Sequence, residues 1–129
     1  MEGNPVGLRL IYLHDWADPD LWDLFLYDKY SAHKLAMLQK CDTAFAEIAE
    51  WSARAGIPVV IGEGYVGYTP LLAGFEEGPV GKFIAEYAIR KGMTLGFWGM
   101  TLCSNCAPHH PFWQDIAWQR KWNDYILRS

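Results

Sequence analysis

The sequence predicts an α/β fold, a single domain spanning residues 1–129 in which strands and helices alternate in the order β-α-β-α-β-α. Three short apolar runs support this prediction, and sequence with helical spacing of apolar residues fills the stretches between them. Strands buried on both faces of a parallel sheet have such almost entirely apolar sequences. We therefore expect parallel strands joined by right-handed crossovers. The three runs cover residues 8–13, 57–62 and 93–100.

Helical sequence follows the first predicted strand. Asp18 can cap a helix, and Pro19 suits its first position because no backbone N–H is needed there. We expect Ser31 to cap a second short helix, and a third helix to begin after Asp42 and end at Gly56. The third helix is predicted to turn one apolar face to the core, formed by Ala44, Phe45, Ile48, Trp51 and Ala55.

Two more helices are predicted on either side of the third strand. One covers residues 81–91 and is closed by Gly92. Its polar row, spaced by four residues, is expected to face water: Lys82, Glu86 and Arg90. The other covers about residues 112–127, and its aromatic side chains at helical spacing are expected in the core: Trp118, Trp122 and Tyr125.

The composition narrows the class of partners. The net charge is −4 and no basic stripe occurs, so we expect neither nucleic acid nor an anionic membrane as a partner. No apolar run approaches the ~20 residues that span a bilayer, and the N-terminal sequence lacks the basic start and apolar segment of a signal peptide. Three cysteines do not form a disulfide framework. As the sequence stands, we expect a cytoplasmic protein.

A single carboxylate follows the second apolar run, in "VVIGEGYVGY". Ligands bind at the carboxyl ends of parallel strands, where this sequence is expected to place Glu63 together with His14 and Trp16 after the first strand and Trp98 at the third. Indole rings stack on sugar rings, while carboxylate and imidazole groups contact hydroxyls and the anomeric carbon. The set therefore indicates a sugar site, although a glutamate after a strand can equally cap a helix or pair with an arginine.

The chain resembles the C-terminal part of the cellulase-like glycoside hydrolases, which are retaining enzymes built on a (β/α)8 barrel. In that family the seventh strand ends in a glutamate nucleophile, and "IPVVIGEGYVG" is similar to this ending. The eighth strand typically ends in a tryptophan at the sugar subsite, as in "MTLGFWGM", and the sixth often ends in a histidine or tyrosine near the nucleophile, as with the histidine of "LIYLHDW". The resemblance implies a partial TIM barrel, about its last three strand–helix units, with Glu63 as nucleophile.

The resemblance also implies the reaction. Glu63 attacks the anomeric carbon of an oligosaccharide or polysaccharide to form a covalent glycosyl-enzyme, and a second carboxylic acid about 5 Å away protonates the leaving oxygen and later activates water. Tyr65 or Tyr68 can hold Glu63, and His109, in the loop after the last strand, can reach the sugar. No cofactor is expected.

The second acid is missing from the sequence. In the family it is a glutamate after asparagine at the end of the fourth strand, and no Asn-Glu pair occurs here. Glu76 and Glu77 are weaker replacements because "AGFEEGP" is expected to form a solvated loop ahead of a helix. Three explanations stay open: a fragment of a longer chain, a reduced protein that closes a barrel by self-association into a homo-oligomer, or a non-catalytic carbohydrate-binding or assembly remnant.

The segment "CSNCAPHH" carries a competing hypothesis, a small zinc or thiol protein. Cys103, Cys106, His109 and His110 are ligand types that suit zinc. Structural zinc sites usually separate their two ligand pairs by a dozen residues or more, whereas here all four fall within one short loop. Tetrahedral coordination by all four is awkward at this spacing, so no metal site is predicted.

Overall fold

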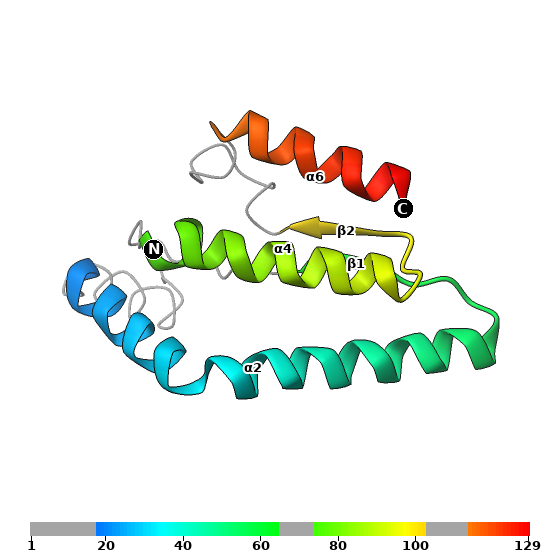
Figure 1. Cartoon of the computed structure of the whole chain (residues 1–129), viewed down its shortest axis with the longest axis horizontal. Helices are drawn as coiled ribbons and strands as arrows, with labels where there is room; N and C mark the ends of the chain where they lie inside the picture. Colours follow the sequence, from blue (N-terminus) through cyan, green and yellow to red (C-terminus); the bar gives the residue numbers. More distant parts are fainter. Residues whose placement is uncertain (1–17, 65–73, 103–113) are drawn as a thin grey trace, which may run out of the picture.

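The computed structural model describes residues 18–64, 74–102 and 114–129, and most of them are helical. Figure 1 shows helix α4 between the long helix α2 and helix α6, with two short strands running alongside α4. The elements, in order, are α2 (Pro19–Ala55), β1 (Val60–Gly64), α3 (Gly74–Glu77), α4 (Pro79–Thr94), β2 (Gly99–Leu102) and α6 (Ile116–Arg128).

The predicted fold class, a β-α-β-α-β-α partial barrel, is wrong. The described part of the chain is mainly helical, and its sheet consists of two strands. Residues 20–55, where three shorter helices were expected, contain neither glycine nor proline, so nothing in the backbone interrupts a helix there and they form one long helix. The first predicted strand, residues 8–13, lies outside the described residues.

Helix α2 begins and ends where the capping residues predict. The Asp18 carboxylate accepts hydrogen bonds from the backbone N–H groups of Asp20 and Leu21 at 2.9 and 3.2 Å, and Gly56 ends the helix with a left-handed φ of 67°. The breaks expected at Ser31 and Asp42 do not occur, because both residues lie inside one continuous helix of 37 residues.

Strands β1 and β2 pair in parallel, and α4 connects them as a crossover. Val60 pairs with Gly99 and Gly64 with Leu102, and the register shifts between Ile61 and Gly64. Both strands begin later than predicted. Helix α4 continues through Gly92 to Thr94, and the chain turns at Gly96, which has a φ of 80°.

The core lies between α4 and α6. Ala85, Ile89, Trp118 and Trp122 are buried together, with Trp122 only 2% exposed. This confirms the prediction that Trp118 and Trp122 belong to the core. Trp51 was expected there as well, but it is 48% exposed on α2.

Helix α2 contacts the other elements at separate points along its length. The Asp23 carboxylate accepts hydrogen bonds from the N–H groups of Gly74 and Phe75 at the start of α3, at 2.8 and 3.1 Å. Further along, the Phe45 ring lies 5.4 Å from that of Phe97, between centroids. Several large apolar side chains of α2 are exposed between these points, Leu35 and Met37 among them, and Trp51 is exposed further along the helix.

None of the helices in the described ranges combines the length and apolar character needed to cross a membrane.

Candidate functional site

Glu63 belongs to β1, next to its last residue Gly64. Because Gly64 pairs with Leu102 at the end of β2, Glu63 lies at the carboxyl edge of the parallel pair. This is the edge at which the sequence predicted a site. Five other predicted site residues lie outside the described residues: His14, Trp16, Tyr65, Tyr68 and His109.

Trp98 lies at the opposite edge of the sheet. It directly precedes β2, and its backbone N–H donates to the carbonyl oxygen of Val59, ahead of β1, at 2.8 Å. The structure therefore does not bring Trp98 and Glu63 together. The predicted strand at 93–100 placed Trp98 near its end, but α4 takes the first residues of that range and the strand begins only at Gly99. The indole is 74% exposed.

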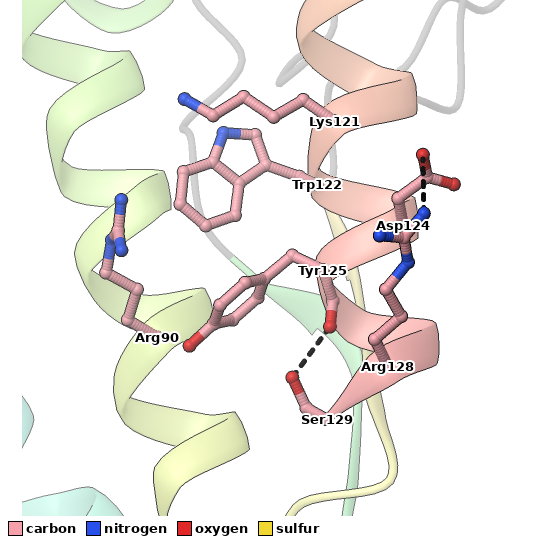
Figure 2. A pocket seen from close by; sticks show the side chains of 7 residues that line it. All are labelled: Arg90, Lys121, Trp122, Asp124, Tyr125, Arg128 and Ser129. Atoms are coloured by element: carbon pink, nitrogen blue, oxygen red, sulfur yellow. Dashed lines mark hydrogen bonds and ion pairs between the residues drawn. The ribbon is translucent and has the colours of Figure 1, made fainter.

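A second concave region, which the sequence did not predict, lies between α4 and α6. It is a groove with a volume of about 410 Å³. Figure 2 shows Lys121 of α6 above the Trp122 indole, Arg90 of α4 beside it and Tyr125 below it. We call this region the α4–α6 groove. Its lining residues are Arg90, Lys121, Trp122, Asp124, Tyr125, Arg128 and Ser129.

Glu86 fixes the indole at the floor of the α4–α6 groove. One of its carboxylate oxygens, Oε1, accepts hydrogen bonds from Trp118 Nε1 at 2.9 Å and from Trp122 Nε1 at 3.2 Å. The water-facing position predicted for Glu86 is therefore wrong, since its carboxylate links the two helices. A charge-assisted hydrogen bond of this kind is stronger than a neutral one.

Asp115 holds the beginning of α6 against α4. Its carboxylate pairs with Lys82 and also accepts from the backbone N–H of Trp118 at 3.1 Å, capping the helix. The hydrogen bond from Lys82, followed by that from the Trp118 amide, lowers the pKa of Asp115. Lys82 and Glu86 thus both contact α6. Arg90 is the third residue of this row, which is spaced by four residues along α4, and it contacts α6 as well.

The cations of the α4–α6 groove contact aromatic rings. The Arg90 Cζ atom lies 4.7 Å from the Trp122 ring centroid and 5.8 Å from that of Tyr125, and Lys121 Nζ lies 4.9 Å from the Trp122 centroid. Among the residues that the structure describes, neither Arg90 nor Lys121 forms an ion pair with a carboxylate. Arg128 pairs with Asp124 at 4.0 Å, and both of these side chains are mostly exposed.

One sequence signal could have located this groove. The α4 row at spacing four, Lys82, Glu86 and Arg90, faces an α6 row at spacing three and four. Each member of the first row has a chemical partner in the second: a carboxylate for the lysine, indole N–H groups for the glutamate and aromatic rings for the arginine. The α6 row is Asp115, Trp118, Trp122 and Tyr125.

A smaller apolar cavity of about 160 Å³ lies between α2 and α4 and includes Cys41. Burial, followed by the neighbouring Asp42 carboxylate, raises the pKa of the Cys41 thiol. Beside it, Asp42 accepts a hydrogen bond from the Tyr87 hydroxyl at 2.8 Å and pairs with Lys91 at 3.1 Å. A thiol with a raised pKa is a poor nucleophile, so this cavity is not a candidate catalytic site.

No group of three or more potential metal ligands occurs in ranges 18–64, 74–102 and 114–129. The segment "CSNCAPHH" lies outside those ranges, so the zinc or thiol hypothesis stays a prediction. Comparisons of the chain with protein-family models, with curated proteins and with solved structures found no match.

Proposed function

We propose that this chain provides the nucleophile half of a retaining glycoside hydrolase site, with Glu63 as nucleophile and an oligosaccharide or polysaccharide as substrate. One observation supports the proposal most: Glu63 belongs to the carboxyl end of a strand in a parallel β1–α4–β2 unit. Open parallel sheets bind their ligands at this edge, so the proposal does not require a barrel. The resemblance of "IPVVIGEGYVG" to the nucleophile strand of cellulase-like hydrolases supports it further.

The chemistry requires a partner carboxylic acid. In a retaining mechanism the nucleophile and the acid/base stand about 5 Å apart on opposite sides of the anomeric carbon. Since the sequence holds no Asn-Glu pair, we propose that this acid comes from a second copy of the chain or from a longer gene product. Glu63 attacks the anomeric carbon, and the acid supplied by the second copy or the longer chain protonates the leaving oxygen.

A covalent-labelling experiment tests Glu63 without the missing acid. The protein is incubated with 2-deoxy-2-fluoro glycosides that carry a dinitrophenolate leaving group, in glucosyl, mannosyl and cellobiosyl forms, and analysed by intact-mass spectrometry. Dinitrophenolate leaves without protonation, and the fluorine slows hydrolysis of the glycosyl-enzyme. We expect one glycosyl adduct that peptide mapping assigns to Glu63.

Two variants sharpen the labelling experiment. Glu63→Gln removes the nucleophile and should abolish the adduct, whereas Glu50→Gln, at an exposed glutamate on α2, should leave it unchanged. A folded wild-type protein that forms no adduct with any of the three sugars would contradict a nucleophilic role. An adduct that persists in Glu63→Gln would assign the reaction to another residue.

The second candidate is a non-catalytic carbohydrate-binding module, and the exposure of Trp98 favours it. An indole that is 74% exposed offers a face on which a sugar ring can stack, and it lies at the edge opposite Glu63. In this case cello-oligosaccharide binding, followed by ligand-observed NMR, is lost in Trp98→Ala and survives in Glu63→Gln. Binding that depends on Glu63 but not on Trp98 would exclude this candidate.

A further inference from the structure

The α4–α6 groove carries a charge opposite to that of the whole chain. The side chains that line it include three cations and one carboxylate, in a protein with a net charge of −4. We propose that the α4–α6 groove binds a phosphate group, carried either by free phosphate or by a phosphorylated small molecule. This proposal is independent of Glu63: most of the lining residues belong to the second half of α6, and the end of α6 lies near the start of β2 in Figure 1, away from the carboxyl edge of the sheet.

The first argument concerns the two cations at the Trp122 ring. Arg90 and Lys121 contact this ring from two different helices, at 4.7 and 4.9 Å from its centroid. A contact with an aromatic ring does not use up N–H donors, since the attraction is between the positive charge and the electrons of the ring. The guanidinium therefore keeps its five donors and the ammonium its three for an oxygen-rich anion.

The second argument is charge balance. A phosphate monoester carries about −1.5 to −2 at neutral pH and three strong acceptor oxygens, and the lining side chains include more cations than carboxylates. Arg128 can join it at little cost, because its pair with Asp124 is long, at 4.0 Å, and exposed pairs contribute little to stability. Of the three cations only Arg128 lies in the last turn of its helix, where a cation also offsets the helix dipole.

The third argument is rigidity and size. The Trp122 indole is 2% exposed and hydrogen-bonded to Glu86, so the floor of the groove is formed before any ligand arrives. A volume of about 410 Å³ exceeds that of a phosphate ion and falls in the range of small-molecule sites. Tyr125 also lines the groove, so a small organic group attached to the phosphate could make apolar contacts with its ring (Figure 2).

Calorimetric titration of the full chain at pH 7.5 and low chloride tests the proposal, with inorganic phosphate, glucose 6-phosphate and malonate as separate ligands. We expect Arg90→Gln and Lys121→Gln each to weaken phosphate binding about tenfold, the effect of one charge-assisted hydrogen bond. Arg120→Gln is the matched control: Arg120 is exposed on α6 and does not line the groove, so its loss should change binding less than about twofold.

The affinities for the different ligands show whether the groove binds free phosphate or a phosphorylated small molecule. Equal affinity for phosphate and glucose 6-phosphate indicates a site for the phosphoryl group alone, and tighter binding of glucose 6-phosphate indicates a phosphorylated small molecule. Arg90→Lys keeps the charge and should bind with intermediate affinity, which distinguishes loss of the site from a failure to fold. The proposal is wrong if the wild type does not bind phosphate, if malonate binds more tightly, or if Arg120→Gln weakens binding as much as Arg90→Gln.

Discussion

Helices α6 and α2 both carry aromatic side chains, but they use them in opposite ways. In α6, Trp118 and Trp122 are buried, and both indole N–H groups donate to Glu86. In α2, Trp22 and Trp51 are 39% and 48% exposed, and no hydrogen bond of either indole N–H occurs among the described residues. The difference shows that helical spacing of tryptophans is not enough to bury them. A facing helix that supplies an acceptor for the N–H groups completes the burial.

The two helices also differ in the contacts that attach them to the rest of the protein. Helix α6 packs through a continuous cluster with Ala85 and Ile89 of α4. Helix α2 is attached through separate contacts, of which the carboxylates of Asp23 and Asp42 provide the polar ones. Because apolar burial dominates folding free energy, we expect α4 and α6 to form the most stable part of the structure and α2 to open first.

The largest expected effect comes from removing one tryptophan from each helix. Trp122→Ala empties the most buried tryptophan site and should lower the free energy of unfolding by about 3–5 kcal/mol. Trp51→Ala removes a half-exposed ring and should cost about 1 kcal/mol or less. Urea denaturation followed by circular dichroism measures both. Equal losses would mean that the tryptophans of the two helices contribute equally to stability, which would contradict the expected difference between α6 and α2.

A smaller effect is expected from the acceptor that the α6 indoles share. Glu86→Leu replaces the carboxylate with an apolar side chain of similar size, which removes the oxygen that accepts from Trp118 and Trp122, and should cost about 2 kcal/mol. Glu86→Gln keeps a carbonyl oxygen and should cost less than half of that. The same urea titration compares the two variants. A Gln variant as unstable as the Leu variant would show that charge, rather than the hydrogen bonds, is what matters at this position.

The smallest effect concerns α2 and depends on pH. Hydrogen bonds from Tyr87 and then Lys91 lower the pKa of Asp42 below its ordinary value of 3.8, and the bond to Asp42 raises the pKa of Tyr87 above 10.0. A lowered acid pKa stabilises the fold above 3.8, and this stabilisation is lost as the pH falls through the lower folded value. A raised tyrosine pKa stabilises it below 10.0, and this stabilisation is lost as the pH rises through the higher folded value.

The Asp42→Asn variant tests this pH dependence of stability. The difference in melting temperature between wild type and Asp42→Asn should be constant from about pH 5 to pH 9 and should shrink on both sides. Asp28→Asn, an exposed aspartate near the beginning of α2, is the control and should show no such profile. A difference that does not change from acid to alkaline pH would mean that the contacts of Asp42 with Tyr87 and Lys91 do not contribute through charge.

The helix ends of α2 could be predicted from sequence because they depend on local chemistry. Asp18 caps through its own side chain, and Gly56 takes a left-handed φ that glycine favours. The interior of α2 could not be predicted in the same way. Ser31 and Asp42 are good capping residues, but a cap forms only where the helix has a reason to end, and Asp42 instead uses its carboxylate to contact Tyr87 and Lys91 on α4.

The candidate sites show the same division between local and tertiary information. The position of Glu63 at the end of a strand follows from the apolar run before it, and the structure has β1 there. The α4–α6 groove depends on two segments about 30 residues apart in sequence: the row on each helix can be recognised locally, but only the match between the two rows places Arg90 next to Trp122. Trp98 was misplaced because the boundary between α4 and β2 is set by how far α4 extends past Gly92.

The uninterrupted length of α2 has a hydrodynamic consequence. A helix of 37 residues is about 55 Å long, whereas a compact chain of 129 residues has a radius of gyration of about 14 Å and hence a diameter near 36 Å. The long helix therefore extends beyond the dimensions of a spherical protein of this mass. We expect a lower sedimentation coefficient and a longer rotational correlation time than those of a sphere of 14.7 kDa. In NMR relaxation, amide N–H bonds parallel to the α2 axis should relax at rates different from those of N–H bonds perpendicular to it.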